Sequence, residues 1–170
     1  MKVIIISDSH LNRNILEVIH ERHSQESELF IHCGDSQLMA TDEVLKKYKT
    51  VRGNCDMDIS IPLTQTITVT PKHTMYVTHG HLCDVKYSIH RLHYKALEAN
   101  ANIVCFGHSH EISCELIDGI LYLNPGSVLL PRNTREKTYV QLELDETNQA
   151  QVIFLEAETG KHLGSYTFNL

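Results

Sequence analysis

The chain has 170 residues, of which 42% are hydrophobic and 21% charged, values typical of one compact domain with a buried core rather than of a disordered chain. The formal net charge is −6, and the 15 Lys and Arg residues form no basic stripe, so stable binding of nucleic acid is not expected. No run approaches the about 20 apolar residues of a membrane span, and the first apolar run is too short for a signal peptide. We therefore expect a cytoplasmic protein without a membrane partner.

Cysteine and histidine usage narrows the kinds of site that the chain can carry. The five cysteines include no CxxC pair, which argues against a disulfide framework or a structural zinc knuckle. The twelve histidines are unusually many for a chain of this length. We expect six of them on the surface, namely His20, His23, His73, His90, His93 and His162. The others lie beside Asp, Gly and Asn in short clusters.

The first part of the chain alternates predicted strands and helices. Residues 3–7 form a continuous apolar run, as in a parallel strand buried on both faces. A helix follows, capped by Asn12 or Asn14 and ending near His23. The pattern then predicts a strand at 29–33, a short helix at 41–48 and a strand at 50–52.

The rest of the chain is richer in predicted strands. The sequence predicts antiparallel strands around a turn at Pro71–Lys72, and Asp118–Gly119 is a strong hairpin signal. Apolar residues at helical spacing predict a helix at 84–99. We expect one α/β domain over residues 1–170, built from two facing sheets with helices outside. The remaining predicted strands cover residues 65–70, 74–78, 103–106, 112–117, 120–123, 138–144, 151–156 and 165–168.

Five polar clusters each follow a predicted strand. In open α/β sheets, ligands bind at the carboxyl ends of the strands, so loops that are distant in sequence meet there. Three of the clusters place a Gly before the polar residue, which permits a tight turn. The clusters are Ser7-Asp8-Ser9-His10, Gly34-Asp35, Gly53-Asn54-Cys55-Asp56, His79-Gly80-His81 and Gly107-His108-Ser109-His110.

The residue types in these clusters fit a pair of divalent cations. Asp35 stands alone after a strand and is the natural carboxylate to bridge two cations. Mixed imidazole and oxygen donors suit manganese, iron, zinc or nickel, and the absence of thiolate argues against a tight structural zinc site. We assign one cation to Asp8, His10, Asp35 and His110, and the other to Asp35, Asn54, His79 and His108.

Each motif alone is a weak indication, because single DxH, GD or GNxD motifs occur often by accident or as turns. The ordered set is strong. It resembles the calcineurin-like metallophosphoesterase superfamily and, within it, the small YfcE-like phosphodiesterases. The resemblance rests on SDSHLN, HCGDSQ, VRGNCD, VTHGH, FGHSH and LNPGS, which run from residue 7 to residue 127.

The resemblance implies a four-layer αββα sandwich and metal-dependent hydrolysis of phosphodiesters, often with manganese. It also supports the assignment of the ligands given above. Nickel, iron, zinc and magnesium remain alternatives to manganese. The expected chemistry is in-line displacement at phosphorus by a hydroxide shared by the two cations, because metal binding lowers the pKa of water toward about 7.

The sequence does not decide which group gives a proton to the leaving oxygen. In many members of the wider superfamily a His follows the Asn and acts on the leaving group, but here that position is Cys55. The small family usually has this Cys, so the difference does not imply inactivity. Asp56, His81 or a metal-bound water are the candidates for proton delivery.

Several alternatives remain open. The run from His79 to Asp84 has some likeness to the HxHxDH motif of metallo-β-lactamase-type hydrolases, but its final His is absent and the other clusters would be unexplained. The turn at residues 124–127 is interpreted as a structural turn that packs near the metal-binding loops rather than as a phosphate-binding turn.

Two other functions compete with a phosphodiesterase. One is a protein-binding scaffold, because the retromer subunit resembles this fold and has lost key ligands. The other is a phosphomonoesterase or nucleotidase. We expect a small phosphodiester as substrate. The sequence leaves the natural substrate and the oligomeric state, including a homo-oligomer, undetermined.

Overall fold

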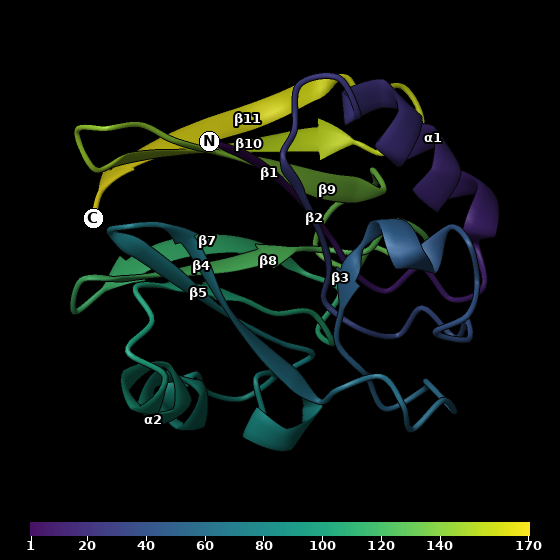
Figure 1. Cartoon of the computed structure of the whole chain (residues 1–170), viewed down its shortest axis with the longest axis horizontal. Coiled ribbons are helices and arrows are strands. Elements are labelled where there is room, and N and C mark those ends of the chain that lie inside the picture. Colours follow the sequence, from purple (N-terminus) through teal and green to yellow (C-terminus); the bar gives the residue numbers. More distant parts are fainter.

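Two β-sheets facing each other form the centre of the molecule (Figure 1). The computed structural model describes residues 1–170. The first sheet has six strands in the order β11-β10-β9-β1-β2-β3, and β1 pairs in parallel with β2 and antiparallel with β9. Its strands are β1 (Lys2–Ile6), β2 (Leu29–His32), β3 (Lys49–Thr50), β9 (Thr138–Leu144), β10 (Gln149–Glu156) and β11 (His162–Asn169).

The second sheet has five strands in the order β4-β5-β6-β8-β7. Its three inner strands are parallel, as expected for strands covered on both faces. The turn at Asp118–Gly119 joins β7 to β8 with positive φ at both residues, which is the backbone of the predicted hairpin. The strands are β4 (Thr64–Thr70), β5 (His73–Thr78), β6 (Ile103–Cys105), β7 (Ile112–Ile117) and β8 (Ile120–Pro125).

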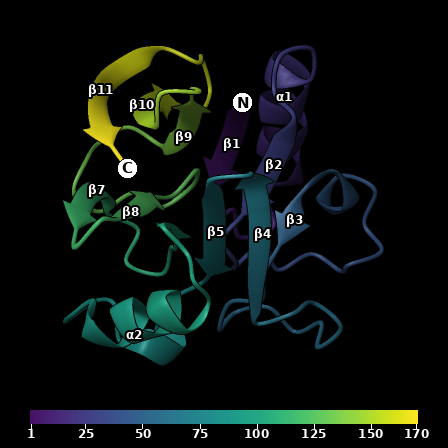
Figure 2. The same ribbon diagram turned by 60° about the vertical axis from the view of Figure 1, so that its left-hand side comes forward.

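The helices α1 (Arg13–His23) and α2 (His90–Glu98) lie on the outer faces of the two sheets (Figures 1 and 2). A buried apolar cluster between the sheets includes Val3, Val77 and Leu142. Separate clusters join α1 to the first sheet and α2 to the second. The predicted αββα sandwich is therefore confirmed. Neither helix is long and apolar enough to cross a lipid bilayer.

Helix α1 follows the prediction closely. Asn12 is its N-cap, and the Asn12 side chain accepts a hydrogen bond from the backbone N–H of Ile15 at 3.2 Å. Leu16 and Ile19 are fully buried on the side that faces the sheet. The cap and the buried side of α1 hold the start of this helix in place. The loop between β1 and α1, which carries the first polar cluster, is therefore anchored at both ends.

Two predicted helices are wrong in extent. Residues 41–48 form only the short 3₁₀ helix η1 (Leu45–Lys47). The Asp42 carboxylate accepts the N–H of Val44 at 2.9 Å, a local bond that competes with helix formation. At residues 84–99 the helix begins only at His90, because Asp84 has a left-handed φ of 55° and follows a 3₁₀ turn, η2 (His81–Cys83).

Two histidines expected on the surface are buried. His23 is 5% exposed, and its Nε2 lies 2.8 Å from the Tyr139 hydroxyl across the contact between α1 and β9. His73 is 2% exposed at the start of β5, where its Nδ1 lies 2.8 Å from the Thr70 hydroxyl. Residue type alone suggested exposure, but each ring has a hydroxyl partner, a distant one for His23 and a local one for His73.

Candidate metal centre and active site

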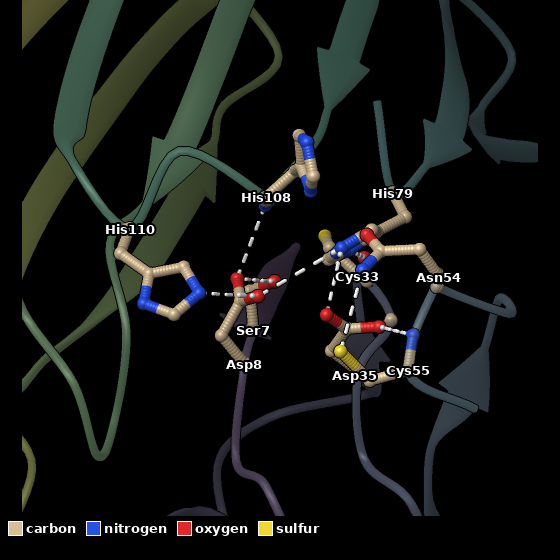
Figure 3. A network of polar contacts seen from close by, with 12 residues as sticks. Ser7, Asp8, Cys33, Asp35, Asn54, Cys55, His79, His108 and His110 are labelled. Atoms are coloured by element: carbon tan, nitrogen blue, oxygen red, sulfur yellow. Dashed lines mark hydrogen bonds and ion pairs between the residues drawn. The ribbon is translucent and has the colours of Figure 1, made fainter. Parts of the chain in front are cut away.

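The five polar clusters meet at one edge of the sandwich, where the parallel strands end (Figure 3). Backbone hydrogen bonds tie the loops together directly. The Asp8 N–H donates to the Gly34 carbonyl at 3.0 Å, and the Gly107 N–H donates to the His79 carbonyl at 3.1 Å. Loops that follow β1, β2, β5 and β6 are thereby held against one another, as the strand-end argument predicted.

The Asp8 carboxylate lies at the centre of the cluster. Its Oδ1 is 3.1 Å from His110 Nε2, 3.8 Å from His79 Nε2 and 3.9 Å from His10 Nε2. Its Oδ2 accepts hydrogen bonds from the Ser7 hydroxyl at 2.5 Å and from the His108 N–H at 3.2 Å. One carboxylate oxygen is therefore fixed by the protein, and the other faces three imidazole nitrogens.

Asp35 occupies a matching position beside Asp8. Its Oδ2 lies 3.2 Å from His79 Nε2, and its Oδ1 accepts the backbone N–H of Cys55 at 2.8 Å. The donor atoms of Asp8, Asp35 and His79 all lie within 4.8 Å of one another, and those of Asp8, His10 and His110 do so as well. His79 thus faces both carboxylates (Figure 3).

Hydrogen bonds on the far side of three rings orient their Nε2 atoms. His79 Nδ1 lies 2.8 Å from the Cys33 carbonyl, and His110 Nδ1 lies 2.8 Å from the Leu130 carbonyl. A carbonyl only accepts, so Nδ1 donates in both cases, and a neutral ring then presents an unprotonated Nε2. His10 Nδ1 lies 3.0 Å from Gln37 Oε1 in the same arrangement. Such outer partners are typical of metal-binding histidines.

Several buried polar atoms of the site have no hydrogen-bond partner in the protein. They are Asp8 Oδ1, His10 Nε2, His79 Nε2 and His81 Nδ1. An unpaired buried polar group is costly, so such a concentration calls for a ligand. Donor atoms about 2.0–2.2 Å from one cation lie about 3–4 Å from each other, which is the range of the separations around Asp8 Oδ1. These residues therefore fit divalent cations.

Glycines at two positions allow the carboxylates to sit so close to the neighbouring loops. A Cβ on Gly53 would lie 2.0 Å from Asp35 Oδ1, and a Cβ on Gly107 would lie 1.9 Å from the Ser7 hydroxyl oxygen and 2.7 Å from Asp8 Oδ2. Both contacts are far shorter than van der Waals distances. The glycines that were noted as turn residues thus also make room for the donor atoms.

The protonation of the carboxylates reflects their histidine partners. Burial raises the pKa of Asp8, but the neighbouring imidazoles of His110 and His79 outweigh burial and hold it below its usual range. The same balance, with His79 as the main partner, holds the pKa of Asp35 below its usual range. The Asp8 contact in turn raises the pKa of His110. Both carboxylates are therefore ionised at neutral pH and available to cations.

Asn54 and His108 are less firmly held than the other predicted ligands. The Asn54 amide donates to Cys55 Sγ at 3.3 Å, and the side chain of His108 forms no hydrogen bond. The His108 ring lies 5.1 Å from the His79 ring, measured between centroids, on the same side of the site. All seven predicted ligands thus gather at this edge, but these two make the weakest contacts with the protein.

Comparison with known proteins identifies the family. Residues 1–147 match the calcineurin-like phosphoesterase superfamily domain. The chain belongs to this superfamily. Among its relatives, the probable metallophosphoesterase YsnB of Bacillus subtilis is 41% identical over 92% of this chain and 91% of its own length. The phosphodiesterase YfcE of Escherichia coli is 31% identical over 61% of this chain and 56% of its own length.

Solved structures show the same fold. A predicted phosphoesterase from Streptococcus pneumoniae superposes with a TM-score of 0.93 at 32% identity, covering 99% of this chain and 97% of its own. Vps29 of Entamoeba histolytica, solved with zinc, gives a TM-score of 0.75 at 17% identity over 99% of both chains, a likeness of fold alone. The chain is therefore a metallophosphoesterase of the hydrolase class with residues suited to divalent metal ions.

Asp56 and His81, the two predicted proton donors, have different surroundings in this metallophosphoesterase. Asp56 is 8% exposed and accepts hydrogen bonds from the N–H groups of Asp35, Gly53 and Gln37 and from the Ser36 hydroxyl. It therefore clamps the loop after β2 to the Gly53 turn. The His81 ring is half-buried, lies 5.5 Å from the His79 ring between centroids, and leaves Nδ1 unpaired.

Some supporting residues escaped the sequence interpretation. Gln37 Oε1 lies 3.0 Å from His10 Nδ1, and Ser7, which was part of the first polar cluster but had no assigned role, donates to Asp8. The turn at residues 124–127, in contrast, was predicted to pack near these loops, and it does: Ser127 Oγ donates to the Asp8 carbonyl at 2.8 Å, and the Asn124 amide donates to the Gly107 carbonyl at 3.1 Å. Ser7 could have been found from its place next to the predicted ligand Asp8, whereas no local pattern marks Gln37.

Proposed function

We propose that the chain is a phosphodiesterase that uses two divalent cations. Manganese is the preferred metal, and nickel, iron, zinc and magnesium are the alternatives. The observation that carries this proposal is the set of three imidazole Nε2 atoms within 3.9 Å of the unpaired Asp8 Oδ1. Two buried carboxylates next to these rings supply the negative charge that a pair of cations needs.

In this proposal, each cation has its own set of side chains and Asp35 belongs to both. Asp8, His10 and His110 hold one cation with Asp35, and Asn54, His79 and His108 hold the other with Asp35. When bound, the cations lower the pKa of water and neutralise negative charge on the phosphoryl oxygens. The hydrogen bonds to Gln37, Cys33 and Leu130 keep the rings in place.

Two side chains of the protein were candidates for supplying a proton to the leaving oxygen of the substrate. Asp56 already accepts hydrogen bonds from the neighbouring loops, so we assign it to holding Asp35 rather than to proton transfer. His81 is the side chain assigned to the leaving oxygen, because its Nδ1 is unpaired and its ring lies beside those of His79 and His108. A proton held at a ring nitrogen of His81 would pass to the departing alkoxide.

The test is the hydrolysis of bis(4-nitrophenyl) phosphate by protein reconstituted with manganese. Wild-type protein should turn over this diester faster than 4-nitrophenyl phosphate, a monoester. Asp35→Asn should lower kcat/KM by about a thousandfold or more, because it removes the shared charge while keeping the shape of the side chain. Asp118→Asn, in an exposed hairpin turn, is the matched control and should keep full activity.

Three results would contradict the proposal in different ways. Full activity in Asp35→Asn would exclude a shared carboxylate. Preference for the monoester would indicate a phosphomonoesterase or nucleotidase. Absence of bound metal after reconstitution, together with no hydrolysis, would favour a protein-binding scaffold.

A further inference from the structure

A recess of about 340 Å³ adjoins the metal-binding edge and takes no part in the site described so far. It lies between the start of β7, the segment before α2 and the loop after β8. Ser109 lines it, and Ser109 stands between the predicted ligands His108 and His110. We call it the Lys86–Arg132 recess after the two basic side chains in its wall.

The recess is continuous with the chain segment that carries two metal ligands. Glu111, which follows His110, forms part of its wall. The Arg132 backbone N–H donates to the His110 carbonyl at 3.1 Å, so the Arg132 segment is fixed relative to that ligand. A molecule with its phosphodiester on the cations could therefore extend one of its ends into the recess.

One part of the recess is apolar. Phe106 is 5% exposed and directly precedes the glycine of the last polar cluster. Val85, Ile89 and Ile112 are partly buried and complete this surface. Partly exposed apolar side chains around a concave surface are typical of sites that accept a flat apolar group of a ligand.

The other part of the recess carries two positively charged side chains, Lys86 and Arg132. Neither the Lys86 ammonium nor the Arg132 guanidinium forms an ion pair or a side-chain hydrogen bond. Both side chains are exposed to solvent. Glu111 offsets one of the two charges, which leaves a net positive recess on a chain with a net charge of −6.

We propose that the Lys86–Arg132 recess binds the non-reacting end of the substrate, and that this end is a flat apolar group carrying a second anionic group. A nucleoside with an additional phosphate has this chemistry. The proposal rests on the phosphodiesterase function proposed above and names the substrate class of that site. The two basic side chains, Lys86 and Arg132, suffice to bind one additional phosphate, whereas a long nucleic acid would need many more phosphate contacts.

The experiment compares two diesters that share the same reacting group. One is the 5′-(4-nitrophenyl phosphate) of thymidine, and the other is the same compound with a phosphate on the 3′ oxygen. Both release 4-nitrophenol, so any difference reports on the distal phosphate. In wild-type protein with manganese we expect the 3′-phosphate to raise kcat/KM by about tenfold, mainly through a lower KM.

Charge variants test whether the recess causes this preference. The double variant Lys86→Gln/Arg132→Gln should lower the ratio of the two kcat/KM values to near one. Glu111→Gln should raise the ratio, because it removes the opposing carboxylate. The matched control is Arg135→Gln/Lys161→Gln, which removes two exposed cations that have no ion pair and should leave the ratio unchanged.

Each outcome decides between the two proposals. Equal turnover of both diesters by wild-type protein would overturn the role of the recess and leave the phosphodiesterase function intact. A preference that survives in Lys86→Gln/Arg132→Gln would also overturn it, since another surface would then bind the phosphate. Hydrolysis of neither diester, nor of bis(4-nitrophenyl) phosphate, would overturn the phosphodiesterase function and the substrate class with it.

Discussion

Two histidines with the same burial have opposite environments. His32, at the end of β2, and His79, just after β5, are both 0% exposed. His32 Nδ1 accepts the Gly34 N–H at 3.1 Å, and its Nε2 lies 2.9 Å from the Ser9 hydroxyl, so both of its ring nitrogens have protein partners. His79 Nε2 has no hydrogen-bond partner and faces two carboxylates.

This difference supports the proposal that His79 binds a cation and that His32 has a structural role. A buried ring whose nitrogens are both satisfied only holds loops together. A buried ring with one nitrogen satisfied and the other aimed at two buried carboxylates, as in His79, fits the cation site proposed above. The two rings lie in the same edge of the sandwich, so the contrast reflects their partners rather than their location.

Exchanging each ring for an amide should separate the two roles most clearly. His79→Gln should reduce kcat/KM for bis(4-nitrophenyl) phosphate by about a thousandfold, because it removes a ligand to a cation. Added manganese should raise Tm of the wild-type protein, and this rise should shrink in His79→Gln. His32→Gln should instead cost about 2–3 kcal/mol of unfolding free energy, because it leaves buried partners unpaired.

The contrast would fail if His32→Gln lost the manganese-dependent rise in Tm while His79→Gln kept it. Thermal melts with and without manganese, combined with urea unfolding of the metal-free variants, give both quantities.

A change that leaves every ligand in place tests whether the positions of the donor atoms matter. Gly53→Ala would put a Cβ 2.0 Å from Asp35 Oδ1, so the carboxylate must move. Because small displacements of catalytic groups are costly, we expect activity to fall by about a hundredfold. Gly164→Ala, whose added Cβ would meet no atom within 4 Å, is the matched control. Equal activities in the two variants would show that the site tolerates displacement of Asp35.

The smallest expected effect is a pH dependence of stability from His32. Burial lowers the pKa of His32 to about 4. Its folded-state pKa lies below the unfolded value of about 6.5, so the neutral ring favours the folded state, and stability should fall as the pH drops from about 6.5 toward about 4. Urea unfolding of metal-free protein at several pH values measures the slope, which should be shallower in His32→Gln. An unchanged slope in that variant would assign the titration to other groups.

Much of this architecture was predictable because strand and turn signals are local. The run at 3–7, the Asp118–Gly119 hairpin and the Asn12 cap follow from apolar periodicity and turn chemistry. The predicted helix at 41–48 was wrong, because the Val44 N–H donates to the Asp42 carboxylate and only a 3₁₀ turn forms there.

The site was predictable in composition but not in detail. Strand-end placement brought the polar clusters together, as expected. The outer contacts of Gln37 with His10 and of Leu130 with His110 join residues 27 and 20 positions apart, and no local pattern marks them. The burial of His23 was missed for the same reason, since its partner Tyr139 lies 116 positions away in the sequence.

The measurement that tests the central claim most directly is the number of cations bound per chain. Metal-free protein titrated with manganese and followed by calorimetry should bind about two cations per chain, and Asp35→Asn should bind at most one. A wild-type protein that binds one cation or none, or an Asp35→Asn protein that still binds two, would contradict a centre in which Asp35 joins two cations.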